Sequence, residues 1–521
     1  MSQFHLHAQW PWLGVWTTPD VLVVLNSQVQ TIESQGWHWV PATIDNIMLL
    51  ECTWPIDSVS PQYREVREYL MRIDPNILAW VDQQLVAVGL RPDDFMTYQK
   101  SCIAQAIQNG KIFNASDPGT GKTRTTLATL AIWRISKGIA VVPKSIIDEW
   151  YREARKLNFP IELITLNSKD DSSSLEARSN LVLSMKDMSH KKSILLTSYS
   201  SFTEVKRGAG SSKKKYHSIQ EAVVEYAPEV MVCDELWHAS SPTSKRTKSL
   251  METGPFVPKF IALNGTPVGH SAQDMWSQLN IMGMMPWSLE EFNYHFVRLR
   301  SVNVGRFKKM VPIGGKNIGL LLQHIRPFWF RVAKEVVLDL PPKSPAETIN
   351  LEMPKPLREL YDAVKKDGLI PLDDPFNLAG DRVKDIRLCQ LSGGIATYGD
   401  KLNRRWVELP CAKIEYLKQW AKDCWNGSER RFIVWCFFNR EVARITKELR
   451  AILGDDRVVA ITGDEEKFLL VDNPMCRYNW STFKDSFNSR APGQIQGIVA
   501  QISKLNAGAN LQGCDDMIYF S

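Results

Sequence analysis

Short apolar runs recur along this chain between longer segments of mixed polarity. In the middle of the chain, the runs that predict strands are 111–115, 139–142, 194–197, 230–233 and 260–263. Runs of this length are typical of strands that are buried on both faces. Segments of helical pattern separate them, 125–137 among these, which predicts a parallel sheet with helices on both sides.

A second series of the same kind lies towards the C-terminus. Its predicted strands are 432–436, 458–461, 497–500 and 517–520. Between the two series, Leu340-Pro341-Pro342-Lys343 interrupts the pattern, because proline ends regular elements. We therefore expect one α/β domain over residues 93–335, a hinge over 336–345 and another α/β domain over 346–521.

The first 92 residues have a different pattern. Apolar runs at 21–25 and 47–50 alternate with turns, and a helical segment follows at 62–71. This predicts a small α/β accessory domain over residues 1–92. No internal repeat accompanies it.

A phosphate-binding loop follows the first predicted strand of the middle series. Glycines at alternate positions let the backbone turn tightly, so that successive N–H groups point at one anion. The lysine then reaches the β- and γ-phosphates, and the hydroxyl beside it faces Mg²⁺. The sequence therefore predicts an ATP and Mg²⁺ site that includes Gly119, Thr120, Gly121, Lys122 and Thr123.

Two acidic residues, Asp234 and Glu235, directly follow the predicted strand 230–233. An aspartate at this position holds Mg²⁺, and the glutamate after it polarises the attacking water. The plain alternative is an acidic pair that merely ends a surface strand. The phosphate loop upstream favours the catalytic interpretation, with Lys122, Asp234 and Glu235 as catalytic residues.

Composition limits the class of protein. A chain of 521 residues is too long for a single hydrophobic core, so more than one domain is expected. Its contents of 44% hydrophobic and 23% charged residues are typical of soluble globular chains. The 63 basic and 57 acidic residues leave a net charge of +6, so a polyanion must be met by local basic patches. The nine cysteines contain no CxxC pair, which predicts neither a zinc site nor a disulfide framework.

No apolar run approaches the ~18–20 residues that span a bilayer, and the N-terminus lacks the pattern of a secretion signal. We therefore expect no membrane partner and no secretion. The expected location is the cytoplasm or nucleoid, or the nucleus if the organism is a eukaryote.

Further motifs stand in a fixed order around the phosphate loop and the acidic pair. They are Tyr98-Gln99, VVPKS at 141–145 followed by Trp150, LTSY at 196–199, PTSKRTK at 242–248, LNGTP at 263–267, DMWSQL at 274–279 and RPFWFR at 326–331. Together they resemble the Swi/Snf-like branch of the superfamily-two helicases. In the second half, segments 432–438, 461–464 and 508–512 are similar to the family's motifs less tightly.

This resemblance implies two tandem RecA-like parallel-sheet domains and a role for each matching residue. Gln99 is expected to read the adenine edge. The segment Gly265, Thr266 and Pro267 is expected to couple the ATP site to DNA. Contacts to the DNA backbone are expected from Lys144, Ser145, Thr197 and Asn510.

The implied function is an ATP-dependent motor that moves along double-stranded DNA through sequence-independent backbone contacts. One alternative is an RNA-directed superfamily-two helicase, although segments 242–248 and 327–343 favour DNA. Another is a nucleotide-regulated DNA-binding module with little turnover. The biological pathway stays open at this point.

The chain departs from the family pattern at three places. The acidic box reads Asp234-Glu235-Leu236-Trp237, which displaces His238 by one position. Leu505-Asn506 stands where the family has paired glycines. The chain ends at Ser521, ahead of the family's sixth motif and its arginine finger. We therefore expect a second domain that is incomplete at its C-terminus, and slow ATP hydrolysis with little stimulation by DNA.

Overall fold

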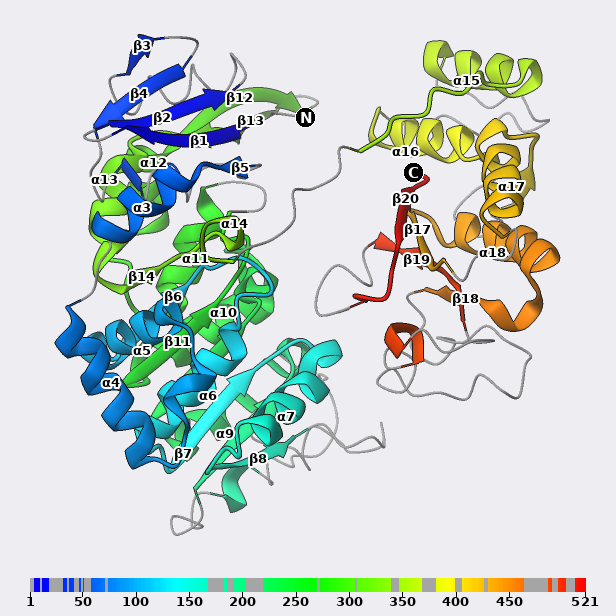
Figure 1. The fold of residues 1–521 in the computed structure, drawn as a ribbon. Coiled ribbons are helices and arrows are strands. Elements are labelled where there is room, and N and C mark those ends of the chain that lie inside the picture. Colours follow the sequence, from blue (N-terminus) through cyan, green and yellow to red (C-terminus); the bar gives the residue numbers. More distant parts are fainter. Residues whose placement is uncertain are drawn as a thin grey trace, which may run out of the picture. The chain divides into compact units, whose positions relative to one another are not determined.

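The fold was examined in a computed structural model of the 521-residue chain. The structure describes residues 4–9, 12–17, 31–34, 37–41, 46–47, 50, 58–70, 74–166, 182–185, 192–202, 219–268, 272–304, 307–338, 346–367, 381–398, 405–425, 430–462, 486–489, 495–502 and 511–521. The chain divides into two compact units, Met1–Ser344 and Pro345–Ser521 (Figure 1). Each unit is described by itself.

A seven-stranded sheet forms the centre of the first unit. Its strand order is β14-β6-β11-β10-β7-β9-β8, and every neighbouring pair is parallel. The strands are β6 (Lys111–Asn114), β7 (Lys137–Val141), β8 (Glu162–Thr165), β9 (Ser193–Thr197), β10 (Val230–Asp234), β11 (Lys259–Leu263) and β14 (Trp329–Phe330). All five apolar runs of the first series are confirmed as strands, with ends that differ by one or two residues. The pattern did not predict β8 and β14.

Alternation along each strand explains why both faces of this sheet are buried. In β10, Met231 and Cys233 belong to one apolar cluster, whereas Val230 and Val232 belong to the other. Because successive side chains point to opposite faces, a continuous apolar run supplies two cores at once. The sheet therefore requires helices on each side.

Two groups of helices supply this cover (Figure 1). One face carries α4 (Pro75–Ala87), α5 (Thr97–Asn109), α6 (Lys122–Ile132) and α7 (Ile147–Lys156). The other carries α9 (Ile219–Tyr226), α10 (Lys245–Thr253), α11 (Gln273–Ile281), α12 (Leu289–Phe296) and α13 (Ile318–Ile325). The α/β class with a parallel sheet and helices on both faces is confirmed.

The helix expected over 125–137 lies earlier than the sequence pattern indicated. It begins at Lys122, after Gly121 in the left-handed region, and ends at Ile132. Arg134 has φ 52°, which a helix cannot accommodate, and Lys137 already opens β7. The early start brings Lys122 into the first turn of the helix.

A second, smaller sheet occupies the N-terminal part of the first unit. Its order is β3-β4-β2-β1-β5, antiparallel except for the parallel pair β1 and β5. The elements are β1 (Phe4–Gln9), β2 (Trp12–Thr17), β3 (Ile32–Ser34), β4 (Trp37–Pro41), β5 (Ser58–Val59) and α3 (Pro61–Leu70). The helix expected over 62–71 is therefore confirmed as α3, whereas the run 21–25 lies outside the described residues.

This small sheet packs against the end of the first unit. Leu6, Leu13 and Val15 share an apolar cluster with Ala333 and Val336, and Val336 belongs to α14 (Lys334–Val337). The Arg64 guanidinium donates from Nη2 to the carbonyl oxygen of Glu335 at 2.7 Å. A hairpin of β12 (Val297–Val304) and β13 (Phe307–Gly315) completes the unit.

The second unit repeats the parallel arrangement with four strands in the order β18-β19-β17-β20. These are β17 (Phe432–Cys436), β18 (Val458–Ile461), β19 (Gly497–Gln501) and β20 (Asp516–Tyr519), so the second series of runs is also confirmed. The other elements are α15 (Lys355–Asp367), α16 (Asp381–Ser392), β15 (Ile395–Tyr398), β16 (Arg405–Glu408), α17 (Ala412–Trp425) and α18 (Asn439–Leu453). Within the residues described for both units, no helix has the length and apolarity to cross a membrane.

Gly254 provides a test of the packing between α10 and α11. A Cβ atom there would lie 2.1 Å from the backbone oxygen of Ile281. We expect Gly254→Ala to lower the free energy of unfolding by about 2 kcal/mol or more, because the backbone must shift. Urea unfolding followed by circular dichroism measures the change.

Gly319 in α13 is the matched control, since a Cβ there meets nothing within 4 Å. Gly319→Ala is expected to be neutral or to stabilise by about 0.5 kcal/mol, because alanine favours the helix. Equal effects of the two substitutions would contradict the packing described at Gly254.

Candidate nucleotide-binding site

The predicted site residues follow the carboxyl ends of three adjacent strands. The phosphate loop follows β6, Gly265 follows β11, and Asp234 ends β10. Strand β11 lies between β6 and β10 in the sheet. Parallel strands bring their carboxyl ends to one edge, where ligands of open α/β sheets bind. The topology therefore gathers these residues at one edge of the sheet.

The loop between β6 and α6 has the backbone geometry that a phosphate site needs. Gly119 and Gly121 have φ 88° and 78°, values that residues with side chains rarely adopt. Helix α6 begins directly after Gly121, so its N-terminal amides face the loop. The Lys122 ammonium donates to the carbonyl oxygen of Ser116 at 2.8 Å, across the loop.

Opposing effects act on the pKa of Lys122. Burial lowers the pKa of its ammonium, while Glu235, Asp234 and Asp117 act to raise it. This places the lysine of the phosphate loop within electrostatic reach of both residues of the acidic pair. A bound polyphosphate would add negative charge beside this part-buried ammonium and so favour its charged form.

Asp234 is almost fully buried, with 4% of its surface exposed. Its carboxylate oxygen Oδ2 accepts a hydrogen bond from the Trp150 indole N–H at 2.9 Å. Burial, with Glu235 adjacent, raises the pKa of Asp234 to about 6, although Trp150 and Lys122 act to lower it. The carboxylate therefore carries a charge that its surroundings do not fully compensate.

The oxygen donors at this edge fit Mg²⁺. The ion binds proteins through one or two carboxylates, completing its shell with substrate phosphates and water. Asp234 offers the carboxylate, and Thr123 in the first turn of α6 offers a hydroxyl. A divalent cation beside Asp234 would also offset the burial of its charge.

Glu235 has an unusual backbone conformation. Its φ of 53° and ψ of 54° lie in the left-handed region, which glutamate seldom adopts. Its Oε2 accepts a hydrogen bond from the indole N–H of Trp237 at 2.8 Å. Both residues flank the start of the short helix η4 (Leu236–Ala239). Such local strain is often found at functional positions.

The loop after β11 contacts the phosphate loop. A Cβ atom on Gly265 would lie 3.0 Å from Pro118 Cδ and 3.3 Å from Lys122 Nζ, so little room is left for a side chain. Buried Asn264 shapes this loop by accepting from the Thr266 amide at 3.0 Å and donating to Gln278 at 2.6 Å. Gln278 in turn donates to the carbonyl oxygen of Pro267. The segment expected to couple ATP to DNA is thus held against Lys122.

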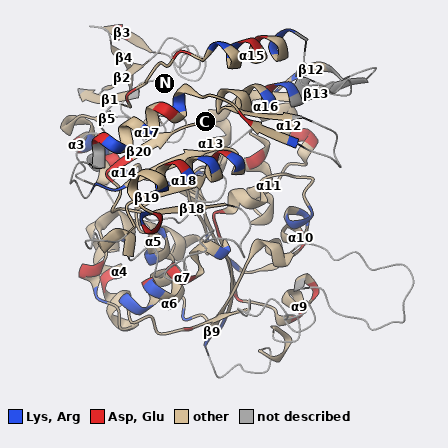
Figure 2. Ribbon diagram, turned by 90° about the vertical axis from the view of Figure 1, so that its right-hand side faces the viewer, with Lys and Arg blue, Asp and Glu red and all other residues tan. Residues whose placement is uncertain are grey.

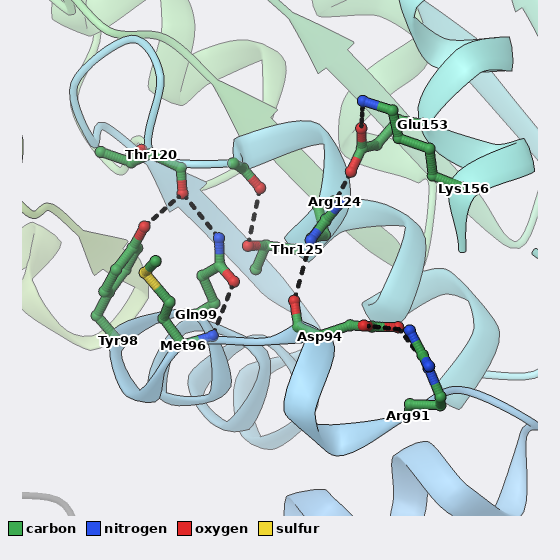
Figure 3. Close-up of polar contacts among 11 residues, drawn as sticks. Arg91, Asp94, Met96, Tyr98, Gln99, Thr120, Arg124, Thr125, Glu153 and Lys156 are labelled. Atoms are coloured by element: carbon green, nitrogen blue, oxygen red, sulfur yellow. Dashed lines mark hydrogen bonds and ion pairs between the residues drawn. The ribbon is translucent and has the colours of Figure 1, made fainter. Parts of the chain in front are cut away.

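Gln99 lies against the phosphate loop from the side of α5 (Figure 3). Its amide nitrogen donates to the carbonyl oxygen of Thr120 at 3.0 Å, as does the Tyr98 hydroxyl. Its amide oxygen accepts from the Met96 backbone N–H at 3.0 Å. Both ends of the Gln99 amide therefore bind protein in this conformation. Contact with an adenine would have to share or replace these bonds.

The other side of the phosphate loop is bonded to the segment after β14. The amide of Asp117 donates to the carbonyl oxygen of Val332, and Asp117 Oδ2 accepts from the Lys334 amide at 3.0 Å. Arg331 forms an ion pair with Asp117 at 3.4 Å. The Ser116 hydroxyl accepts from the Val332 amide. Segment 331–334 is therefore a structural part of this loop.

The residues expected to contact DNA lie in different surroundings. Lys144 and Ser145 are exposed in η2 (Lys144–Ile146), just beyond the carboxyl end of β7. Thr197 is fully buried at the end of β9, and its hydroxyl has no hydrogen-bond partner among the described residues. In this conformation Thr197 cannot reach a phosphate. Asn510 lies outside the described residues.

The segment that contains these motifs matches a protein-family model. The model of the SNF2-related domain matches residues 64–386, which is more than half of the chain. The chain belongs to this family. The match includes the phosphate loop, the acidic pair and the segment after β11, so these motifs lie within an SNF2-related domain.

Curated relatives agree with this assignment. A Caenorhabditis elegans homologue of the SWI/SNF-related, matrix-associated, actin-dependent regulator of chromatin subfamily A containing DEAD/H box 1 is 25% identical over 260 residues, 47% of this chain and 24% of its own. DNA repair protein RAD5 of Gibberella zeae is 24% identical over 235 residues, 43% of this chain and 19% of its own. The chain thus spans about a quarter or less of the length of the relatives it matches.

Two solved structures of SNF2-type and helicase proteins are similar over most of the chain. The Sulfolobus solfataricus SWI2/SNF2 ATPase core in complex with dsDNA has a TM-score of 0.35 and 17% identity, covering 82% of this chain and 81% of its own. The Pyrococcus furiosus Hef helicase domain has a TM-score of 0.43 and 13% identity, covering 83% and 91%. The fold is established here by the strand order of the chain itself.

Sequence reasoning missed the partners that hold the acidic pair and the loop. The sequence indicates Trp150 only as part of a motif, and Trp237 only as a departure from the family pattern. Asp117 and Arg331 had no role assigned. Local spacing could not reveal these contacts, because Trp150 and Asp234 lie 84 residues apart and Asp117 and Lys334 lie 217 residues apart.

The bond between Trp150 and Asp234 can be tested by a double-mutant cycle at pH 8, where the carboxylate is charged. We expect Trp150→Phe alone to lower the free energy of unfolding by about 2–3 kcal/mol, because it leaves a buried carboxylate without its donor. The same substitution in an Asp234→Ala background is expected to cost at least about 1 kcal/mol less. Urea unfolding followed by circular dichroism gives the four values. Additive effects would show that the bond contributes nothing.

Proposed function

We propose that this protein is an ATP-dependent motor that acts on double-stranded DNA, of the Swi/Snf type. The observation that carries the proposal is the juxtaposition of Lys122 with Asp234 and Glu235 at one sheet edge. A lysine on a phosphate loop and an acidic pair at a strand end are the parts that nucleotide hydrolysis needs. Membership of the SNF2-related family supports the same activity.

In this proposal each residue has a defined task. The amides of the loop and of the first turn of α6 bind the phosphates, and Lys122 leaves the Ser116 carbonyl to bind the β- and γ-phosphates. Mg²⁺, held by Asp234 and Thr123, would neutralise charge on the phosphates. Glu235 orients the attacking water. The close approach of the loop after β11 to Lys122 would make this loop sensitive to what the lysine binds.

Duplex DNA is the proposed polymer partner because the relatives are named for chromatin regulation and DNA repair. Lys144 and Ser145 are exposed beyond the end of β7, where they could meet backbone phosphates. Helix α10 adds Lys245, Arg246 and Lys248, and the blue segments of the ribbon in Figure 2 mark basic residues on this helix and on α15. No DNA-repair or chromatin name points to RNA, so the RNA-directed alternative has no support from the relatives.

The nucleotide site is tested by comparing two variants. Lys122→Ala is expected to weaken ATP binding by at least about 10-fold, because it removes a charge-assisted contact to the phosphates. Glu235→Gln is expected to keep ATP binding but to lower hydrolysis by about 100-fold or more, because it removes the water-orienting carboxylate. Isothermal titration calorimetry and a phosphate-release assay measure the two effects.

The control for charge is Lys156→Ala at the C-terminal end of α7, whose ammonium pairs with Glu153 at 3.6 Å. It is expected to leave ATP affinity unchanged. Unaltered ATP affinity in Lys122→Ala would overturn the assignment of the site.

DNA binding is expected to be insensitive to sequence and sensitive to salt, because the contacts go to phosphates. Two unrelated duplexes of equal length are expected to bind within about 3-fold of each other. Lys144→Ala is expected to reduce the salt dependence by about one counterion, whereas Lys156→Ala leaves it unchanged. Fluorescence anisotropy over a salt series measures both. A strong preference for one duplex would refute the interpretation.

A further inference from the structure

The residue two positions after the catalytic glutamate distinguishes this acidic box. Trp237 stands where the family's DEAH-like box has histidine, so that the box reads Asp234-Glu235-Leu236-Trp237. The structure gives this tryptophan a specific contact. Its indole N–H donates to Glu235 Oε2 at 2.8 Å, within the range of a good hydrogen bond to a carboxylate.

A stacked ring packs against the face of the Trp237 indole. The ring of His238 stacks on it with centroids 3.8 Å apart and an angle of 24° between the planes. His238 also lies 5.3 Å from the ring of Tyr199, and buried Tyr199 donates through its hydroxyl to the carbonyl oxygen of Asp234 at 2.8 Å. Burial, with Arg246 nearby, lowers the pKa of His238 to about 4, so the stacked imidazole is neutral near pH 7.

The position of Glu235 decides what this contact can do. Glu235 has the largest favourable electrostatic effect on Lys122, so its carboxylate lies near the lysine that is proposed to bind the γ-phosphate. One oxygen, Oε2, is occupied by Trp237. Within the described part of the chain, Oε1 takes part in no hydrogen bond and is the oxygen left for a water molecule. Glu235 itself lies directly after β10 with its backbone in the left-handed region, a local strain of the kind found at functional positions.

We propose that Trp237 is a positioning residue for hydrolysis: its indole N–H holds one oxygen of Glu235, so that the other orients the attacking water. This inference rests on the proposed function and deepens it at the same site. In this role the indole takes no part in the chemistry and acts only through its hydrogen bond to Glu235. It limits the orientations of a flexible carboxylate, and general-base groups depend strongly on such orientation.

The test compares Trp237→Phe with Trp237→His. Phenylalanine keeps an aromatic ring to stack on His238 but removes the N–H donor, whereas histidine restores a ring N–H. For Trp237→Phe we expect kcat for ATP hydrolysis to fall on the order of 10-fold, while KM and the dissociation constant for ATP stay within about 2-fold of wild type. Trp237→His is expected to recover part of the lost kcat.

Trp276→Phe is the matched control, since Trp276 also donates an indole hydrogen bond, to the carbonyl oxygen of Trp287 at 2.9 Å. It is expected to leave kcat unchanged. Single-turnover assays with enzyme in excess give hydrolysis rates for all four proteins even where turnover is slow, and titration calorimetry gives ATP binding.

An unchanged or increased kcat in Trp237→Phe would overturn the positioning role, because the indole would then be irrelevant or would restrain the glutamate unproductively. Wild-type protein that binds ATP in a Lys122-dependent way but does not hydrolyse it would also overturn this role, while leaving the nucleotide site intact. Absence of ATP binding by the wild type would instead overturn the proposed function itself.

Discussion

The structure of the site depends on keeping the part-buried ammonium of Lys122 near the carboxylates of Asp234 and Glu235 without a direct salt bridge between them. Lys122 takes part in none of the ion pairs found among the described residues, although Asp234 and Glu235 lie within its electrostatic reach. Its ammonium is bonded to the Ser116 carbonyl, Asp234 to Trp150, and Glu235 to Trp237. Neutral partners therefore hold three charged groups apart. A direct salt bridge would lower the energy of the empty site but would also compete with phosphate and Mg²⁺.

The sheet topology makes this separation possible. Because β11 lies between β6 and β10, the chain after β11 passes between the phosphate loop and the acidic pair. Gly265 lies at this place. Because glycine has no Cβ, there is room for Pro118 and Lys122 beside it. The fully buried side chains of Asn264 and Gln278 are hydrogen-bonded to each other and fix the path of this loop. The loop proposed to couple ATP to DNA thus passes so close to the lysine that a Cβ at position 265 would lie 3.3 Å from its ammonium.

In the seven-stranded sheet the sequence predicted the five inner strands and missed the two edge strands. All nine apolar runs of the two series, such as 230–233 and 458–461, became strands. The pattern did not predict the edge strands β8 and β14, because neither has a long apolar run. Strand β8 (Glu162–Thr165) is partly exposed, and β14 has only two residues. Motif spacing likewise predicted a site with Lys122, Asp234 and Glu235, and the sheet topology brings these three residues to one edge. It could not identify Trp150 or Asp117 as their supports, because those hydrogen bonds join segments that only the fold brings together.

The phosphate loop is also connected to the N-terminal sheet by hydrogen bonds and side-chain packing. Asp117 and Ser116 are bonded to segment 331–334, and the next residues, in α14, pack beneath β1 and β2. Arg64 of α3 binds the Glu335 carbonyl from the same side. A loop that must bind phosphate needs a fixed backbone, and glycine-rich loops have little stiffness of their own. Here the stiffness comes from partners far away in the sequence. The described part of the N-terminal sheet and helix α3 therefore support the phosphate loop indirectly, through α14 and the residues just before it.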